Sequence, residues 1–250
     1  MDLTNRNRQD ELMDQPGLGE NDHRQALAGL QRVNWISFTA SGLWKEIIRI
    51  VQRRKLEKVQ LLDVACGGGD LATWIACQGE RKGLKINVDG LDISPTAVAE
   101  AQRKAATTST SNVRFLIRDV LSEPLETETG APYDIVMSSL FFHHLEIHQT
   151  VNLLQKMVKS TRHAVIIDDL RRTQFGYYLA YFGCRILSRS RIVHVDASLS
   201  VQAAYTSGEM RSLVKQAKIE NFGSCRIVNH WPQRLRLIWQ RTEEGEKDVR

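Results

Sequence analysis

The chain has 250 residues, which suits one α/β domain with added segments better than two full domains. Hydrophobic residues make up 42% and charged residues 25%, values typical of a globular protein, so composition alone identifies no function. The net charge of +5 comes from lysines and arginines that are scattered rather than clustered, which argues against a nucleic-acid-binding surface.

The four cysteines form no CxxC pair and show no histidine spacing typical of a zinc site. Cysteines used in this way are typical of a reducing compartment. The polar stretch 1–20 lacks the apolar segment of a signal peptide, and no apolar run reaches the ~18 residues of a spanning helix. We therefore expect a cytoplasmic protein without stable membrane insertion, and a loose N-terminal arm over residues 1–20.

Apolar periodicity predicts two N-terminal helices, at 21–33 and 42–56. The pattern then changes to short apolar runs separated by helical stretches, which indicates a parallel sheet covered on both faces. Five strands are expected in chain order, at 59–65, 84–92, 113–119, 133–140 and 163–170. Helices are expected between them at 70–78, from Ser94-Pro95 to about 106, and near 147–159.

The C-terminal part follows a different pattern. Thr206 and Glu209 have the spacing of a capping box, which predicts the start of a helix. Two further strands, at 223–231 and 234–241, are separated by a short turn. A hairpin at the end of a parallel sheet makes one of its strands antiparallel.

A glycine-rich loop follows the first predicted strand. It runs Asp63-Val-Ala-Cys-Gly67-Gly68-Gly69-Asp70 and opens a helix, whose free N–H groups suit an electronegative ligand atom. Glycines allow positive φ and leave room for a ligand against the backbone. The spacing Gly67-x-Gly69-x-x-Ala72 also satisfies the dinucleotide fingerprint, so an NAD-binding oxidoreductase stays open on this motif alone.

Three acidic residues distinguish the cofactor classes. Asp92 ends the second strand, where a carboxylate can accept hydrogen bonds from both ribose hydroxyls, as in NAD enzymes. Asp63, just ahead of the glycines, suits a ligand with an ammonium and a sulfonium and would repel a pyrophosphate. Asp119, after the third strand, can accept from an adenine amine. Each alone also fits a turn or cap, but successive strand ends meet where open α/β sheets bind ligands.

The segments DVACGGGDLA, LDIS, RDV and YDIVMSSLFFHHL resemble the successive motifs of class I S-adenosylmethionine-dependent methyltransferases, especially the ubiquinone and menaquinone methyltransferase group. The resemblance covers about residues 57–170 and the closing hairpin. It implies a Rossmann-like α/β sheet of seven strands with an antiparallel last strand, and S-adenosyl-L-methionine as cofactor. The cofactor-binding residues that it implies are Asp63, Ala65, Gly67, Gly69, Asp92, Ile93, Asp119, Val120 and Ser139.

The chain departs from this family at Ala65-Cys66, where many members have glycine followed by a small or polar residue. We expect changed packing near the methionine moiety rather than lost binding. The same resemblance divides the chain into an N-terminal arm with helices, 1–56, and a methyltransferase domain, 57–250, with a helical insertion at 171–205.

His143 and His144 follow the fourth strand, at the rim where a methyl acceptor should lie. Imidazole titrates near neutrality, so either residue can serve as a base for a phenolic acceptor whose own pKa is near ~10. A His-His pair at this position is also common in the resembled family, including members that methylate carbon, where it can simply shape the cofactor pocket. The catalytic and structural interpretations both stand.

No group of residues has the sequence spacing of a zinc or magnesium site, so we expect no metal. Asp168 and Asp169 lie near the histidines, but neighbouring residues of a strand point to opposite faces and cannot easily share one ion.

The insertion 171–205 is rich in aromatic residues and arginines. One helical face carries Phe175, Tyr178 and Phe182, together with Leu179 and Ile186. Three interpretations are open: core packing of an extra helix, an apolar lid that binds a hydrophobic acceptor through Phe175, Tyr178 and Phe182, and a helix that touches membrane surfaces transiently. DLRR before this helix, with ELMD near the N-terminus, resembles methyltransferases encoded beside type III polyketide synthases, which implies phenolic or alkylresorcinol-like acceptors.

The sequence therefore favours O-methylation of a small hydrophobic acceptor in secondary metabolism. C-methylation of a quinone precursor is the alternative. A nucleic-acid methyltransferase is disfavoured because SSLF stands where such an enzyme has an NPPY-like tetrapeptide and no RNA-binding module is present. An NAD-binding oxidoreductase is disfavoured by Asp63 and by the terminal hairpin.

Overall fold

The computed structural model describes residues 3–12, 19, 39–108, 110–188 and 190–242. Its strands are β1 (Lys58–Val64), β2 (Lys85–Asp92), β3 (Val113–Ile117), β4 (Tyr133–Ser139), β5 (Thr161–Leu170), β6 (Gly223–His230) and β7 (Arg234–Arg241). Its α-helices are α2 (Thr39–Arg54), α3 (Asp70–Arg81), α4 (Pro95–Ala106), α5 (Ile147–Lys159), α6 (Gln174–Leu187), α7 (Arg191–Ala203) and α8 (Ser207–Ala217). Two short 3₁₀ helices, η2 (Phe142–His144) and η3 (Ile219–Asn221), complete the described elements.

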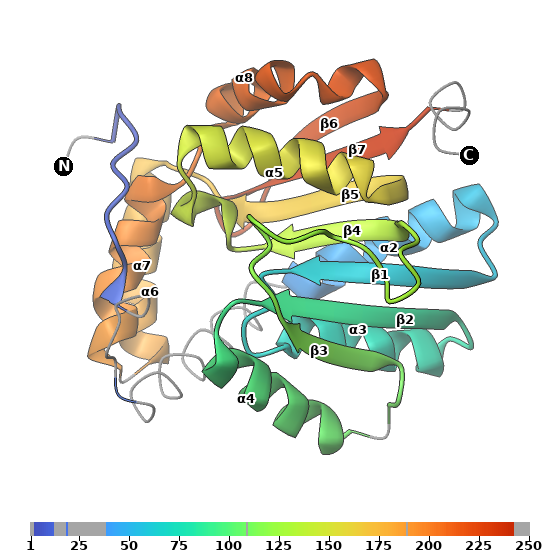
Figure 1. The fold of residues 1–250 in the computed structure, drawn as a ribbon. Coiled ribbons are helices and arrows are strands. Elements are labelled where there is room, and N and C mark those ends of the chain that lie inside the picture. Colours follow the sequence, from blue (N-terminus) through green and yellow to red (C-terminus); the bar gives the residue numbers. More distant parts are fainter. Residues whose placement is uncertain (1–2, 13–18, 20–38, 109, 189, 243–250) are drawn as a thin grey trace.

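The strands form one sheet in the order β3-β2-β1-β4-β5-β7-β6. Every neighbouring pair is parallel except those that include β7, which runs antiparallel to β5 and β6 (Figure 1). The predicted sheet with its antiparallel last strand is confirmed. The helix expected at 42–56 corresponds to α2, whereas the one expected at 21–33 lies outside the described residues.

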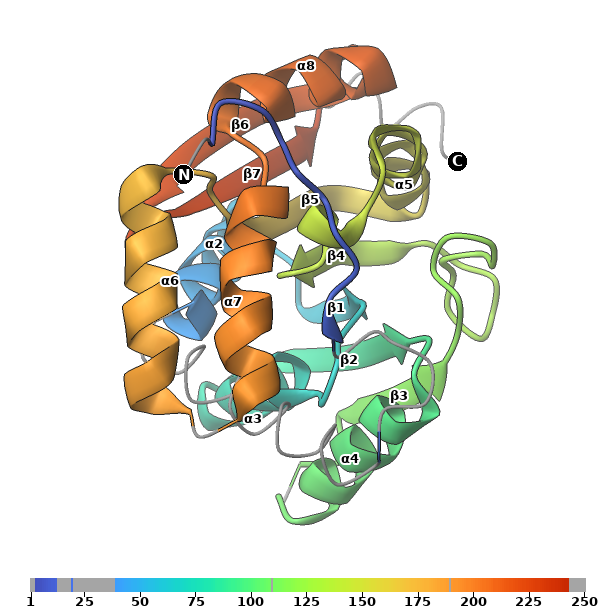
Figure 2. The same ribbon diagram turned by 90° about the vertical axis from the view of Figure 1, so that its left-hand side faces the viewer.

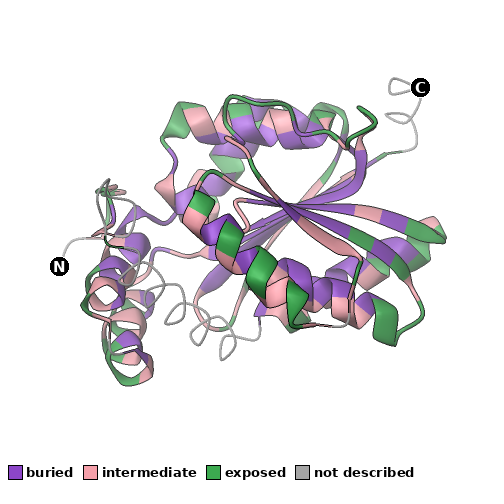
Figure 3. Cartoon of the chain, turned by 60° about the horizontal axis from the view of Figure 1, so that its bottom comes forward, coloured by how far each residue is buried: buried purple, intermediate pink, exposed green. Residues whose placement is uncertain are grey.

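Neighbouring residues of the central strands bury their side chains on opposite faces of the sheet. Leu62 and Val136 pack with α5 and α8, whereas Leu61 and Ile135 pack with α2, α3 and α4. Figure 3 shows the buried sheet between these two helical layers. Helix α2 belongs to this core, because the Leu43 side chain is fully buried against the sheet.

Helix caps lie where the sequence predicts them. The Ser94 hydroxyl accepts a hydrogen bond from the Ala97 N–H, with a proline at the first helical position. Thr206 and Glu209 form a reciprocal capping box at the start of α8. These caps fix where α4 and α8 begin, and therefore how the preceding loops meet the edge of the sheet.

The insertion consists of α6 and α7, which lie side by side beyond the carboxyl ends of the parallel strands (Figures 1 and 2). Cys184 and Val193 are buried between them. On α6, however, Phe175, Tyr178 and Phe182 are 57%, 54% and 60% exposed. Core packing of this aromatic face is therefore the wrong interpretation, because its side chains do not pack into the protein. No helix in the described part of the chain is long and apolar enough to cross a bilayer.

The N-terminal strap, residues 3–12, corrects the expectation of a loose arm. Figure 2 shows it running beside α7, toward the loop after β4. The Arg6 guanidinium donates to the backbone carbonyls of His143 and Leu145, at 2.7 and 2.8 Å, and also to that of Ala203. The Leu12 N–H donates to the Asp196 carboxylate of α7, at 2.8 Å. The polar composition predicts a loose arm, but Arg6 and the Leu12 N–H bind groups of folded elements.

Candidate active site

The glycine loop between β1 and α3 adopts backbone conformations that few side chains tolerate. Gly67 and Gly69 have φ of 54° and 72°. A Cβ atom on Gly69 would lie 2.6 Å from the side chains of Ala101 and Phe115, whereas one on Gly67 would enter open space. Gly69 is therefore required for packing, and Gly67 leaves the backbone accessible to a ligand.

The backbone conformation of Ala65 explains why many members of the resembled family have glycine at this position. Its φ is 56°, in the left-handed region where an L-residue costs roughly 1–2 kcal/mol. Alanine in place of the family's glycine therefore strains the backbone at this position, in addition to any change in packing near a ligand.

Asp92 holds the loop in place. One carboxylate oxygen accepts from the Gly67 N–H at 2.8 Å, and the other accepts from the Ser94 N–H at 2.9 Å. The carboxylate thus connects the ends of β1 and β2, which are neighbours in the sheet.

Asp63 is buried beneath the loop, 2% exposed, at the end of β1. Burial raises the pKa of its carboxyl group to about 8, and the nearby negative charge of Asp92 contributes to the rise. A bound ammonium or sulfonium would favour the ionised form and lower this pKa. The residue is therefore suited to a cationic ligand.

The remaining predicted cofactor residues differ in what they can offer. The Ile93 side chain is 66% exposed beside the loop, whereas Val120 is buried in the hydrophobic core and could contact a cofactor only through its backbone. The Asp119 carboxylate accepts from the Leu121 N–H and the Ser122 hydroxyl, which hold its pKa below the ordinary value. Ser139 ends β4 and accepts from Arg234. Asp119 thus also stabilises its own turn.

A second group of residues lies on η2, directly after β4. Because β4 pairs with β1, this segment is next to the glycine loop. His143 is buried, its Nδ1 lies 2.7 Å from the Asp169 carboxylate, and its backbone N–H donates to the same group. Burial opposes ionisation of Asp169, but His143 outweighs it and holds the pKa of the carboxyl group below its ordinary value. The His144 ring packs against that of His143, with centroids 4.2 Å apart.

The strap adds a third side chain to this place. Glu11 is 5% exposed, and its carboxylate lies 3.7 Å from His143 Nε2 and 3.9 Å from His144 Nε2. The Ser200 hydroxyl of α7 donates to the same carboxylate. We call Glu11, His143 and His144 the rim cluster. One possible ligand atom from each of the three side chains lies within 4.8 Å of the other two.

Arg172 anchors the strap from the opposite end. It is 4% exposed and donates to the backbone carbonyls of Leu3 and Ala204, and to the Glu209 carboxylate of α8. Sequence reasoning placed neither Glu11, Asp169 nor Arg172 in the site. Their signal was present in the segments ELMD and DLRR, which resemble the same methyltransferases although they are far apart in the chain.

Asp168 and Asp169 face different partners, as expected for adjacent strand residues. The Asp168 carboxylate accepts from Arg234 at 2.6 Å and Arg236 at 2.7 Å, and lies 2.8 Å from the His230 ring. These cations hold the pKa of Asp168 well below its ordinary value despite complete burial. Asp168 therefore belongs to a buried ionic cluster, and Asp169 belongs to the histidine side.

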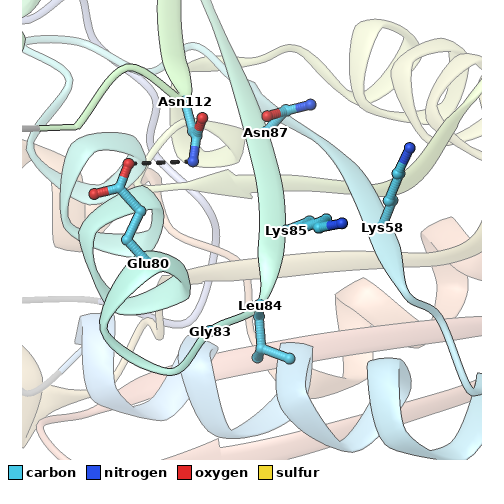
Figure 4. Close-up of a pocket in the computed structure, with 7 residues that line it drawn as sticks. All are labelled: Lys58, Glu80, Gly83, Leu84, Lys85, Asn87 and Asn112. Carbon is cyan, nitrogen blue, oxygen red and sulfur yellow. Dashed lines mark hydrogen bonds between the residues drawn. The ribbon is translucent and has the colours of Figure 1, made fainter.

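A surface hollow of about 520 Å³ lies at the opposite edge of the sheet (Figure 4). Its lining includes Lys58 and Lys85, the first residues of β1 and β2, and Asn112, whose amide donates to Glu80 at 3.1 Å. Open α/β sheets bind ligands at the carboxyl ends of their strands, not at these amino ends. None of the predicted site residues lines this hollow, so we assign the site to the other edge.

The strand order, the glycine loop and the acidic strand ends define a class I methyltransferase fold. Residues 61–164 match the family described as a methyltransferase domain. The chain is therefore similar to class I S-adenosylmethionine-dependent methyltransferases, and the part that matches their family is residues 61–164.

The proteins to which this chain is similar are named for different acceptors. The ubiquinone biosynthesis O-methyltransferase of Acinetobacter baumannii is 27% identical over 159 residues, which cover 63% of this chain and 58% of that protein. The magnesium protoporphyrin IX methyltransferase of Synechocystis PCC 6803 with bound SAH (S-adenosylhomocysteine) has a TM-score of 0.55 at 17% identity, covering 92% and 91% of the two chains. A plantazolicin methyltransferase with an analog and SAH has a TM-score of 0.60 at 15% identity, covering 90% and 99%. The structural likenesses show the fold alone.

Proposed function

We propose that this enzyme transfers the methyl group of S-adenosyl-L-methionine to a hydroxyl of a small hydrophobic, phenolic or polyketide-derived acceptor in the cytoplasm. The observation that carries the proposal is the rim cluster beside the glycine loop. The cluster holds two imidazoles and the Glu11 carboxylate, with the Asp169 carboxylate hydrogen-bonded to His143, and these groups can accept the proton of an acceptor hydroxyl.

In this proposal the cofactor occupies the carboxyl ends of β1 to β4. Asp63 faces the cationic methionine end, Ala65, Gly67 and Gly69 form its backbone bed, and Asp92 receives the ribose hydroxyls. The adenine end lies near Ile93, Asp119 and Val120. Ser139 lies between cofactor and acceptor. These roles account for a buried carboxylate beside a loop with open space above Gly67.

The rim cluster then acts on the acceptor hydroxyl. His144 is the most accessible member, with 23% of its side chain exposed, and we assign it the contact with the hydroxyl. His143, oriented by Asp169, supports it from behind. As the hydroxyl proton passes to the His144 imidazole, a lone pair of the acceptor oxygen attacks the methyl carbon. The new C–O bond forms while the C–S bond breaks. The electron pair of the C–S bond stays on sulfur, which becomes a neutral thioether. Holding both reactants in line supplies much of the acceleration.

The apolar face of α6 supports a hydrophobic acceptor. Phe175, Tyr178 and Phe182 are exposed on a helix at the same edge of the sheet as the rim cluster. Exposed apolar surface of this kind marks a binding region. We assign the face to a lid that covers the apolar part of the acceptor.

The test is product identification by mass spectrometry with methyl-deuterated S-adenosylmethionine and phenols with alkyl tails of increasing length. We expect a product labelled on oxygen, and an affinity that rises up to about fourfold for each added methylene, from ~0.8 kcal/mol each. Phe182→Ala should flatten this dependence on tail length, whereas Phe222→Ala, an exposed phenylalanine after η3, should not. A label on ring carbon would favour the quinone-precursor alternative, and no labelled phenol at all would contradict the proposal.

A further inference from the structure

The rim cluster has the composition of a metal site. Glu11 contributes a carboxylate oxygen, and His143 and His144 each contribute an imidazole nitrogen, all within 4.8 Å of one another. Two histidines with one carboxylate form sites for Zn²⁺ or Fe²⁺, with further positions open to substrate. Sequence spacing could not show this group, because the strap brings Glu11 to histidines more than a hundred residues away along the chain.

The groups around the rim cluster also fit an ion. A metal-binding histidine usually donates its other ring N–H to a carboxylate, which fixes the tautomer and raises the basicity of the metal-binding nitrogen. His143 has this arrangement, because its Nδ1 lies 2.7 Å from Asp169 and its Nε2 points toward Glu11. The Ser200 hydroxyl donates to the Glu11 carboxylate and so orients that group as well.

The distances suit a shared ion better than direct pairing. Glu11 is 3.7 Å from His143 Nε2 and 3.9 Å from His144 Nε2, which is longer than a hydrogen bond. Two ligands of a tetrahedral Zn²⁺ at ~2.1 Å lie about 3.4 Å apart. Small rotations of the three side chains would bring them to that separation around a common centre.

We propose that Glu11, His143 and His144 bind one divalent transition-metal ion, with Zn²⁺ as the best-matched candidate, and that this ion binds the acceptor oxygen. The identity of the acceptor in this inference rests on the proposed function, whereas binding of the ion to the three side chains is independent of it. A hydroxyl bound to the ion loses its proton to solvent at neutral pH, and the resulting oxyanion attacks the methyl group. The histidines then hold the ion, which takes over the activation of the hydroxyl.

A Zn²⁺ ion with three protein ligands keeps one open position and can expand to five-coordination, so two oxygens of one substrate can bind it. An acceptor whose hydroxyl neighbours a second oxygen, either a carbonyl or another hydroxyl, can occupy both positions. We therefore assign the enzyme to acceptors with two adjacent oxygens, rather than to isolated phenols. The substrate class of the proposed function is thereby narrowed.

The test is calorimetric titration with Zn²⁺ of the full chain, purified without a histidine tag and freed of metal by a chelator. We expect one ion per chain, and at least tenfold weaker binding in Glu11→Gln and in His144→Ala. The amide oxygen introduced by Glu11→Gln still accepts from Ser200, and His144 is partly exposed, so both variants should fold. His148→Ala and Glu57→Gln, which alter exposed residues of the same types, should bind as the parent does.

A second measurement follows Co²⁺ by its visible absorption. The spectrum of the loaded protein should change on addition of a phenol with an adjacent carbonyl, and not with a phenol that lacks one. Absence of stoichiometric binding, or equal binding by Glu11→Gln and the parent, would overturn the metal site. If methylation of a phenol persists in chelator with no bound ion, the proposed function stands and this inference is wrong; if Zn²⁺ binds but no phenol is methylated, the reverse holds.

Discussion

In the proposed function, the glycine loop and Asp92 form a cofactor half, and the strap with the histidines of η2 forms an acceptor half. The two proposed halves meet at the same edge of the sheet, but they are assembled differently. The cofactor half is local: residues 63–69 form a single loop, and Asp92 fastens it from the neighbouring strand. The acceptor half joins the N-terminal strap, η2, the end of β5 and α7, which lie far apart in the sequence. A motif can therefore reveal the first half, whereas only the fold reveals the second.

The largest expected effect is on kcat and comes from a change in the rim cluster. His144→Ala should lower kcat by about 10²–10³-fold, within the range for removal of a group that promotes proton loss. Affinity for S-adenosylmethionine should stay within about twofold of the parent value, because the contact is needed mainly in the transition state. Steady-state kinetics with parallel calorimetry measures both quantities.

His148→Ala is the matched control, since it removes an exposed histidine of α5 from outside the rim cluster. Both variants must first show the melting temperature of the parent. Equal loss of activity in the two variants, or loss of cofactor affinity in His144→Ala, would remove the distinction between the halves.

The next effect concerns the cofactor half and depends on pH. Because the pKa of Asp63 is raised to about 8, the unliganded protein holds this carboxyl group protonated below that pH. Binding of a cation must release the proton, so affinity for S-adenosylmethionine should rise by up to about tenfold per unit between about pH 6 and pH 8. Titration in buffers of different ionisation enthalpy measures the released proton.

Asp63→Asn should bind more weakly at pH 8 and lose most of this pH dependence. The buried Asp63 carboxyl group binds its proton more tightly in the folded protein than in the unfolded chain, because its pKa is raised on folding. The unliganded parent should therefore lose stability as the pH rises from about 4 to 8. Asp63→Asn should remove this loss of stability. A parent whose cofactor affinity is flat over this range would contradict the role of Asp63.

The smallest effect tests the strained residue of the loop. Ala65→Gly should raise the free energy of unfolding by about 0.5–1 kcal/mol, because relief of the left-handed strain exceeds the added freedom of the unfolded chain. Denaturant unfolding of the unliganded protein measures the change. If Ala65→Gly instead lowered the free energy of unfolding, the strain at Ala65 would be smaller than the stabilisation lost through the greater freedom of the unfolded chain.

The contrast between the halves also explains what the sequence could predict. Strand positions and caps follow from local patterns. The structure confirms the seven-stranded sheet with its antiparallel last strand, the cap at Ser94 and the capping box at Thr206. Exposure of the α6 aromatic face could not be predicted, since an apolar helical face has the same pattern whether it packs into a core or stays open. The partners of Arg6 and Glu11 could not be predicted either, because they lie more than a hundred residues away in the sequence and only the fold brings them together.

The measurement that tests the account most directly uses the strap. Arg6→Ala removes the guanidinium that donates to the carbonyls of His143 and Leu145, while leaving every residue of the glycine loop intact. Its matched control is Arg53→Ala, on the exposed side of α2. Cofactor affinity is measured by calorimetry, and kcat/KM is measured for the acceptor. The account predicts that Arg6→Ala lowers kcat/KM for the acceptor at least about tenfold, with cofactor affinity within about twofold of the parent. An unchanged kcat/KM, or an equal loss of cofactor affinity, would contradict the claim that the strap builds the acceptor half.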